Sequence, residues 1–185
     1  HGTRTYEADL RTADQFRLER QIHGPVRIRG EARDGRQVKR VFVDPEVEPG
    51  SWQPRLSVLS IDIETDVRTQ EVRAIALSLQ DPFREPPAAG EEVLFLGPEL
   101  EARGVQCYPQ ERQLLQAFRQ RLVALDPDVI TGWNVIDFDI AKLCDRASAL
   151  REPFPLGRDY QPATVLLPST KNGVAVARID GRVAL

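Results

Sequence analysis

Two carboxylates stand two positions apart in the apolar stretch 59–65, which reads Leu-Ser-Ile-Asp-Ile-Glu-Thr. Because side chains alternate between the two faces of a β-strand, Asp62 and Glu64 should point to the same side, about 6–7 Å apart. Such a pair can share one hard divalent cation and reach toward a second, as in two-metal phosphoryl chemistry. Taken alone, the Asp-x-Glu pattern is also typical of a solvated strand edge.

The apolar flanks of this stretch favour a central, buried strand. Leu56 and Val58 precede the stretch, and Ile61 and Ile63 alternate with the two acids. Unpaired carboxylates are costly in a buried strand. The sequence therefore predicts that both acids are buried and that they have a metal ion or a polar partner.

A second polar motif follows about 70 residues later along the chain. It runs from Gly132-Trp133-Asn134 to Phe138-Asp139, between a predicted short strand and a predicted helix. Open α/β sheets commonly place ligands at such strand-to-helix connections. In the first turn of that helix Asp139 would be favoured as an anion by the helix dipole, although Asp137 or Asp139 could instead only cap the helix.

The elements that must position these motifs form an α/β pattern. Strands are predicted at 56–65, 72–79, 93–96 and 129–132, and the first three form an antiparallel meander interrupted by the Pro/Gly loop 81–90. Helices are predicted at 111–125, which ends at Asp126-Pro127, and at 138–150, with Ile140, Ala141, Cys144 and Ala147 facing inward. The chain closes with a predicted hairpin at 174–185 around Asp180-Gly181.

The first 54 residues have a different character. A short helix is predicted to begin at Thr12 or Asp14 and to end near Ile22, followed by a hairpin of 26–30 with 38–43 that turns at Asp34-Gly35. Residues 44–54 are rich in proline and acids and are interpreted as a linker, with a domain boundary near residue 52. The hairpin carries a basic cluster that could contact a phosphate backbone or form a solvated outer face: Arg27, Arg29, Arg33, Arg36, Lys39 and Arg40.

Composition limits the class of protein. The 185 residues are 41% hydrophobic, which suits a real core, and the net charge of −3 argues against a stand-alone duplex binder. Cys107 and Cys144 lack metal-ligand spacing and are expected to be reduced core thiols. No apolar run or signal segment indicates a membrane or secretion, so the cytoplasm is the expected compartment. The chain contains no Met and is interpreted as an excised fragment, with His1 and Gly2 as candidate remnants of a tag.

Both polar motifs resemble a known family. Residues 62–65 resemble the first exonuclease motif, and Asn134 with Phe138-Asp139 resembles the second, of the proofreading 3'-5' exonuclease domain in family B DNA polymerases. Three further segments are similar to the bacterial DNA polymerase II branch: residues 132–134, 156–159 and 171–173. The resemblance covers nearly the whole chain. It implies that residues 1–52 are part of the polymerase amino-terminal domain and that 53–185 are an exonuclease domain with a ribonuclease H-like α/β fold, a mixed sheet flanked by helices.

The resemblance also implies roles for individual residues. Asp62 would bridge two Mg²⁺ or Mn²⁺ ions, Glu64 would hold one ion and orient the attacking water, and Asp139 would ligate the other ion. Thr65 and Asn134 would lie near the terminal nucleotide, and Phe138 would pack beside it. The implied substrate is the 3' end of single-stranded DNA or of a frayed primer-template. The implied partners are the remaining polymerase domains, with a sliding clamp as a further candidate, in the bacterial cytoplasm at the nucleoid and with no membrane.

One family motif is missing. Members of this family carry a third motif, Tyr-x-x-x-Asp, that supplies the last metal-binding Asp. After Asp139 the only Tyr, Tyr160, is followed four positions later by Thr164, and Asp180 is preceded four positions earlier by Val176. The expectation is a fragment truncated before the third motif, with weak exonuclease activity or none, and without a polymerase domain.

Two alternatives remain open. One is a different nuclease of the same carboxylate superfamily, such as a free-standing exoribonuclease, against which the amino-terminal hairpin and the Gly-Trp-Asn context argue. The other is a catalytically silent ribonuclease H-like scaffold that binds single strands or docks to other polymerase domains. Metal binding that depends on Asp62 would separate an enzyme from a scaffold.

Overall fold

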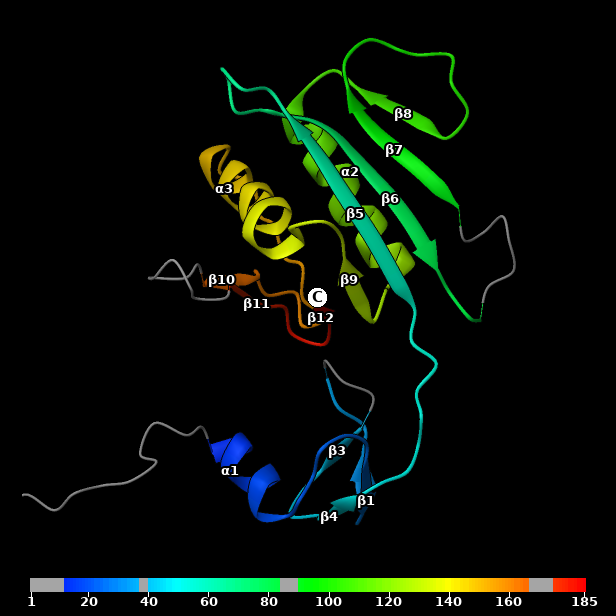
Figure 1. Cartoon of the computed structure of the whole chain (residues 1–185), viewed down its shortest axis with the longest axis vertical. Helices are drawn as coiled ribbons and strands as arrows, with labels where there is room; N and C mark the ends of the chain where they lie inside the picture. The colour runs from blue at the N-terminus through cyan, green and yellow to red at the C-terminus, as the bar shows by residue number, and fades with distance from the viewer. Residues whose placement is uncertain (1–11, 37–39, 84–89, 167–174) are drawn as a thin grey trace, which may run out of the picture. The chain divides into compact units, whose positions relative to one another are not determined.

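A six-stranded mixed sheet forms the centre of residues 55–185, the second of the two units into which the chain divides at Pro54/Arg55 (Figure 1). The computed structural model describes residues 12–36, 40–83, 90–166 and 175–185. The strand order is β12-β9-β5-β6-β7-β8. In chain order the strands are β5 (Val58–Thr65), β6 (Val72–Gln80), β7 (Glu91–Leu96), β8 (Val105–Tyr108), β9 (Val129–Thr131) and β12 (Val183–Ala184).

Strand β5 is central, as predicted. It pairs antiparallel with β6 along its whole length and parallel with β9 at residues 58–60. Strand β6 pairs antiparallel with β7, which confirms the predicted meander. Strand β8 was not predicted and pairs parallel with β7. Its four residues are too few to show a clear alternation beside the flanking Gly and Pro residues.

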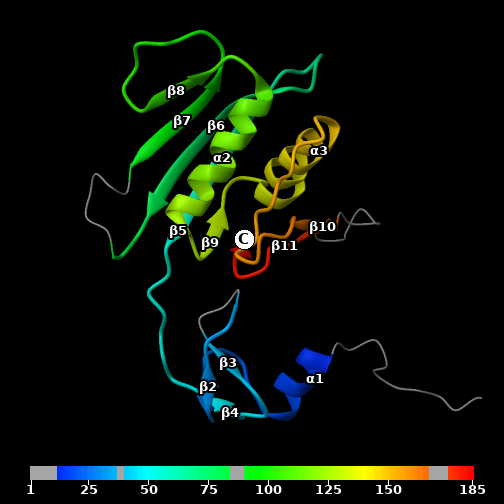
Figure 2. The ribbon, with the colours of Figure 1, turned by 180° about the vertical axis from the view of Figure 1, so that it is seen from behind.

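Helix α2 (Glu111–Leu125) covers one face of this sheet and has the predicted bounds. Figures 1 and 2 show it behind the strands in one view and in front of them in the opposite view. Its buried side includes Leu114, Phe118, Leu122 and Leu125, and the helix contacts β6, β7 and β8 on the buried face of the sheet. The helix ends at Asp126, whose φ of 45° is left-handed and whose N–H donates to the Leu122 carbonyl.

The predicted helix 138–150 is wrong at its beginning. The helical segment begins at Val135 as a π-helical stretch, η1 (Val135–Ile140), and continues as α3 (Ala141–Ala149). Asp139 is therefore not in the first turn, and the dipole argument for its charge does not hold. The inward face is formed by Ile140, Leu143 and Ala147, which are buried, while Ala141 and Cys144 are half-buried. Cys144 and Cys107 are free thiols, as expected.

The carboxyl-terminal hairpin is only partly confirmed. The chain turns tightly at Asp180-Gly181, where the Arg182 N–H donates to the Ile179 carbonyl at 2.9 Å. The arms then separate instead of pairing along their length. Strand β11 (Val176–Arg178) pairs with β10 (Thr164–Leu166), and β12 joins the edge of the large sheet beside β9. Residue 174 of the predicted hairpin lies outside the described residues.

The described residues of the first unit, 12–36 and 40–54, form one helix and two small sheets. The elements are α1 (Thr12–Glu19), β1 (Val26–Arg29), β2 (Ala32–Arg33), β3 (Val41–Phe42) and β4 (Glu46–Pro49). The chain reverses between β2 and β3, around the predicted turn, but residues 26–29 pair with β4 instead of with 38–43. Part of the predicted linker is thus a strand, because Glu48 of β4 forms ion pairs with Arg27 and Arg29 across the sheet, at 3.3 and 3.1 Å. Residues 38 and 39 lie outside the described residues.

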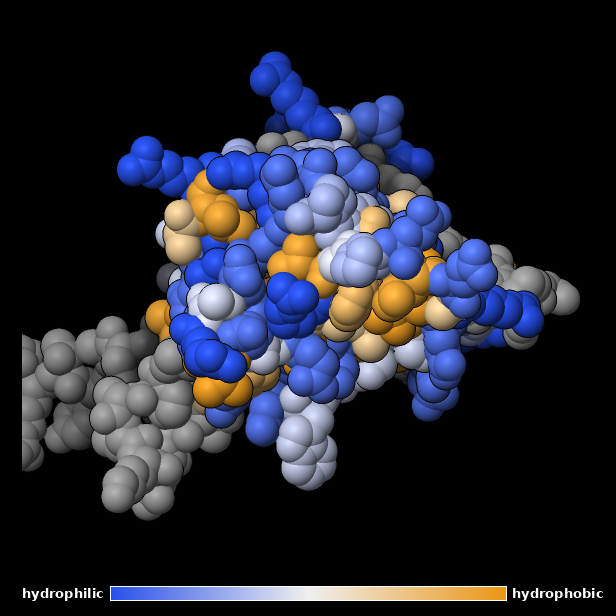
Figure 3. All heavy atoms as spheres, turned by 90° about the horizontal axis from the view of Figure 1, so that it is seen from above, coloured by the Kyte–Doolittle hydropathy of each residue, from blue (hydrophilic) through white to orange (hydrophobic). Residues whose placement is uncertain are grey.

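Seen from the end at which β5 turns into β6, hydrophobic residues form small separate patches among hydrophilic ones (Figure 3). None of the helices in the described ranges is both long enough and apolar enough to cross a bilayer.

Candidate functional site

Asp62 and Glu64 lie on the exposed face of β5. Leu59, Ile61 and Ile63 face the helices and are buried, whereas Ser60 and both acids are exposed. The prediction that these two carboxylates are buried is therefore wrong, because α2 covers the opposite face of the strand. Their shared orientation is as predicted, but desolvation gives no reason for either of them to require a metal ion.

Asp139 is the buried carboxylate of the site, with only 1% of its surface exposed. The Ile63 N–H donates to its Oδ1 at 3.0 Å. Strand β9 pairs with β5 only as far as Ser60, so the backbone of β5 beyond that point has no strand partner on this side. The side chain of Asp139 takes the place of the missing strand at Ile63, the residue that follows Asp62.

The second oxygen of Asp139 has no partner. Within the described ranges Oδ2 is one of two buried side-chain polar atoms without a hydrogen bond, the other being Arg119 Nε. Burial raises the pKa of Asp139, the hydrogen bond from Ile63 opposes that rise, and the charge of Asp62 raises the pKa further. A buried, unpartnered oxygen next to a second carboxylate suits a cation or a proton.

The three acids do not form a complete metal centre. The part of the chain that the structure describes contains no group of three or more His, Cys, Asp or Glu side chains that could hold a metal ion. Asp62 and Asp139 interact through their charges, and Glu64 is not gathered with them into such a group. The donor chemistry suits a hard divalent ion such as Mg²⁺ or Mn²⁺, so Asp62 and Asp139 fit such an ion and Glu64 fits it less well.

The remaining predicted residues lie on two segments, β5 and η1 with the turn that leads into it. Thr65 is half-buried at the end of β5, just after an irregularity in the pairing between Glu64 and Thr65. Asn134 is exposed and has a left-handed φ of 56°, and Phe138 is 42% exposed on η1. All three side chains are open, fully or in part, to a bound molecule.

Trp133 is a candidate that the sequence analysis did not assign. It is 86% exposed, an unusual state for so large an apolar side chain. A Cβ on the preceding Gly132 would lie 2.3 Å from the Ile61 carbonyl oxygen, so this turn runs directly against the residue before Asp62. An aromatic residue within a polar turn next to a candidate site was the available signal.

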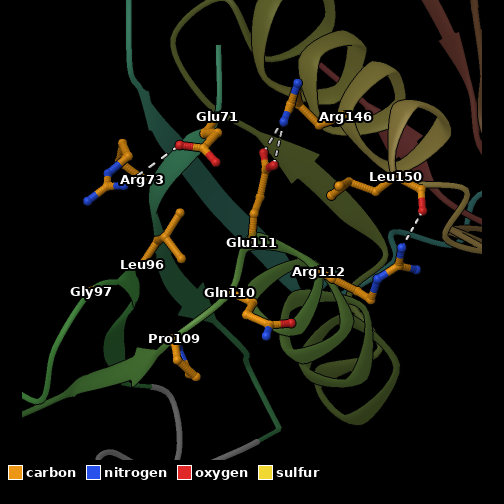
Figure 4. Close-up of a pocket in the computed structure, with 10 residues that line it drawn as sticks. All are labelled: Glu71, Arg73, Leu96, Gly97, Pro109, Gln110, Glu111, Arg112, Arg146 and Leu150. Carbon is orange, nitrogen blue, oxygen red and sulfur yellow. Dashed lines mark hydrogen bonds and ion pairs between the residues drawn. The ribbon is translucent and has the colours of Figure 1, made fainter. Parts of the chain in front are cut away.

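Two cavities lie near these elements. One, of about 250 Å³, is on the exposed face of the sheet and is lined by Ser60, Asp62, Ala76, Ser78 and Val93 among others. The other, of about 430 Å³, is lined by residues of α2, α3 and β6 around Glu111 and Arg146 (Figure 4). The second cavity contains none of the predicted site residues.

Comparisons with known proteins agree on one family. The family described as DNA polymerase family B, exonuclease domain, matches residues 3–159. DNA polymerase II of Escherichia coli is 33% identical over 194 residues, covering 100% of this chain and 22% of that protein. The DNA polymerase delta catalytic subunit of Mesocricetus auratus is 35% identical over 149 residues, covering 72% of this chain and 13% of that protein.

The solved structures agree on the fold. The family B DNA polymerase from Pyrobaculum calidifontis superposes with a TM-score of 0.67 at 23% identity, covering 97% of this chain and 22% of that one. This likeness confirms the predicted ribonuclease H-like α/β fold, with its mixed sheet. With the match over residues 3–159 and the full-length similarity to DNA polymerase II, it follows that the chain belongs to the exonuclease-domain family of the family B DNA polymerases.

Proposed function

We propose that the chain is the proofreading 3'-5' exonuclease part of a DNA-directed DNA polymerase, and that it hydrolyses the 3'-terminal phosphodiester of single-stranded or frayed DNA. The observation that carries the proposal is the buried, unpartnered Oδ2 of Asp139 beside Asp62. In this proposal residues 1–52 belong to the polymerase amino-terminal domain, and residues 53–185 belong to the exonuclease domain but contain no third motif.

The three acids would have different roles in this hydrolysis. Asp62 and Asp139 would hold divalent ions, with Glu64 as a further ligand that orients the attacking water. Bound Mg²⁺ or Mn²⁺ supplies a hydroxide near neutral pH and stabilises the leaving 3'-oxygen. The Ile63 N–H fixes Oδ1 of Asp139 and so leaves Oδ2 free as a ligand. The exposure of Asp62 and Glu64 leaves room for a phosphate from the solvent side.

The surrounding side chains suit an unpaired strand. Trp133 and Phe138 present exposed aromatic surface, and stacking of a base on an aromatic ring contributes about 1–3 kcal/mol. Thr65 and Asn134 would contact the terminal nucleotide. Because the net charge of the chain is −3, attraction of the phosphates would come from bound cations instead of a basic surface. Bases in a duplex are not available for this stacking, which favours a frayed 3' end.

The proposal also names the partners of the chain. The chain spans 22% of the length of E. coli DNA polymerase II, so the remaining polymerase domains, a primer-template and a sliding clamp are proposed partners in a bacterial nucleoid.

A second function is favoured by one observation, the lack of a three-carboxylate group in the described residues. In that case the domain is a catalytically silent scaffold for single-strand binding or domain docking.

The test is digestion of a 5'-labelled single-stranded oligonucleotide with Mg²⁺ or Mn²⁺. The samples are the 185-residue chain, a version that continues past Leu185 through the third motif, and the Asp62→Ala and Ser60→Ala variants of that longer version. Ser60 shares the exposed face of β5 with Asp62 but carries no charge, so Ser60→Ala is the matched control.

The expected result is a ladder of 3'-shortened products from the longer version that persists in Ser60→Ala and disappears in Asp62→Ala. The 185-residue chain should give weak cleavage or none. If the folded longer version leaves the oligonucleotide intact, the scaffold function replaces the exonuclease proposal.

A further inference from the structure

Three polar side chains attach the continuous helical segment η1–α3 to its neighbours. They are Asp139, Lys142 and Arg146, whose spacings of three and seven positions place them near one side of a helix. Asp139 accepts from the Ile63 N–H of β5, and Lys142 Nζ donates to Gln70 Oε1 in the β5–β6 turn at 2.9 Å. Arg146 makes the third attachment, to the first residue of α2 (Figure 4).

This third attachment is a partly buried ion pair, in which the carboxylate is the buried partner. Glu111 is 6% exposed and accepts hydrogen bonds from Arg146 Nε, at 2.8 Å, and from Arg146 Nη2. The Val72 N–H of β6 donates to the same carboxylate at 2.8 Å. Burial alone would raise the pKa of Glu111, but the hydrogen bonds from Arg146 and Val72 outweigh it and hold the pKa below its ordinary value. One carboxylate thus joins α2, α3 and β6.

Val72 connects this ion pair to the end of β5. Val72 is the pairing partner of Thr65, the last residue of β5. Asp139 therefore holds the helical segment at Ile63, and Arg146 holds it, through Glu111, at the level of Thr65. The two attachments lie on either side of Glu64, so a rotation or a slide of η1–α3 along β5 would break one of them.

An open pocket lies beside this ion pair. A cavity of about 430 Å³ borders both Glu111 and Arg146, and it is lined by Glu71, Arg73, Leu96 and Leu150 among others (Figure 4). A buried ion pair adds little net stability compared with apolar residues of the same volume, although it can specify one arrangement of the elements. The ion pair of Glu111 and Arg146 is therefore better explained by the arrangement of elements that it specifies than by a gain in folding stability.

We propose that Glu111 and Arg146 are positioning residues that set the place of Asp139 beside Asp62. The inference rests on the proposed function in so far as these two aspartates would hold a metal ion. Glu111 and Arg146 are not among the predicted site residues, and both act through the helical segment that carries Asp139.

The test uses the chain with Glu111→Gln, Arg146→Met and Arg146→Lys. Glu111→Gln keeps the size of the side chain and an acceptor for the Val72 N–H but removes the charge. The matched control is Arg121→Met, which removes another partly buried ion pair of α2, with Glu92 of β7 at 2.8 Å, and leaves α3 untouched. The two readouts are amide hydrogen exchange at Ile63, which reports on the hydrogen bond to Asp139, and the Kd for Mn²⁺.

For Glu111→Gln and Arg146→Met we expect exchange at Ile63 to be at least about 10-fold faster and the Mn²⁺ Kd to be about 10–100-fold higher, the usual effect of losing a group that orients a ligand. Arg146→Lys, which keeps the charge, should recover part of the slow exchange at Ile63 and part of the Mn²⁺ affinity. Arg121→Met should have the exchange rate and the Mn²⁺ Kd of the wild type. Equal Ile63 exchange in the control and in the Glu111 and Arg146 variants overturns the positioning role. Faster exchange in a chain whose wild type binds no Mn²⁺ supports the positioning role and contradicts only the proposed function.

Discussion

The carboxylate of Asp139 is held where its surroundings oppose its charge. Burial and the neighbouring Asp62 raise its pKa above the ordinary value of 3.8, against the effect of the Ile63 hydrogen bond. The folded chain therefore binds this proton more tightly than the unfolded chain does. The stability contributed by this group falls as the pH rises from about 3.8 through the raised folded pKa. At neutral pH and without a bound cation, the charge of Asp139 therefore lowers the free energy of unfolding.

The first prediction concerns Asp139→Asn. Asparagine keeps an oxygen for the Ile63 N–H and removes the charge, so the free energy of unfolding in EDTA at neutral pH should rise by about 0.5–2 kcal/mol, while Mn²⁺ binding is lost. Urea unfolding and Mn²⁺ titration measure both quantities. The control is Asp137→Asn, since Asp137 is exposed two positions earlier. A decrease in stability for Asp139→Asn would show that its charge is satisfied without a metal.

At this scale the sequence identified the acids but not their surroundings. The spacing of Asp62 and Glu64 was enough to predict a shared face. It could not say which face of the central strand α2 would cover, and assuming burial on both faces gave the wrong environment for both acids. Conversely, the burial of Asp139 depends on β9 ending at Thr131. The end of this strand was predicted to within one residue, but the pattern did not indicate that the side chain of Asp139 would bond the backbone of β5 beyond it.

The turn between β9 and η1 leaves no room for a side chain at Gly132. A Cβ on Gly132 would approach the Ile61 carbonyl oxygen to 2.3 Å. That oxygen belongs to the central strand and cannot move away as the end of a flexible side chain could.

The second prediction is that Gly132→Ala lowers the free energy of unfolding by about 1–3 kcal/mol, the usual cost of forcing atoms into a packed site. Urea unfolding followed by circular dichroism measures it. Gly24→Ala is the control, because a Cβ on Gly24 would meet no atom within 4 Å. Equal stability of the two variants would mean that the turn can move away from β5.

The elements differ in how far they could be predicted. The apolar residues of helix α2 recur over four turns, and the helix ends at Asp126, which has a left-handed φ and precedes a proline. Its bounds could therefore be predicted from the pattern. The π-helical stretch η1 could not be separated from an α-helix by the residue pattern, because such stretches are rare and appear mostly as single turns within α-helices. Strands β8, β10 and β12 contain only two to four residues each, which is too few for alternation to show.

At the scale of residues 55–185, ion pairs join the carboxyl-terminal segment to the connection between α2 and β9. Arg158 contacts Asp126 at 2.8 Å and Asp128 at 3.0 Å, and Arg182 contacts Asp126 at 2.9 Å. Burial alone would raise the pKa of Asp126 and Asp128. The hydrogen bonds outweigh it and hold both pKa values below the ordinary 3.8, chiefly from Arg158 for Asp126 and from Ser57 and Arg158 for Asp128.

The third prediction follows from the sign of these shifts. Carboxyls with a lowered folded pKa contribute stability above their ordinary values, and that stability is lost as the pH falls through the folded values. Glu111, Asp126 and Asp128 act in this sense and Asp139 acts in the opposite one. The midpoint of urea unfolding should therefore fall as the pH drops below about 4.5.

The double variant Asp126→Asn/Asp128→Asn tests the source of this acid sensitivity. It should be less stable at neutral pH and should lose less stability on acidification than the wild type. An unchanged slope in the double variant would assign the acid sensitivity to other groups, such as Glu111.

The early end of β9 has one more consequence, which concerns association between chains. A strand that lacks a neighbour can recruit a strand of another molecule, and natural sheets avoid this by covering or interrupting the free edge. Along β5 the interruption is a side chain, since the Ile63 N–H is already occupied by Asp139. The carboxylate proposed for chemistry therefore also protects the central strand from intermolecular pairing, so its loss would expose the sheet to aggregation as well as disable the site.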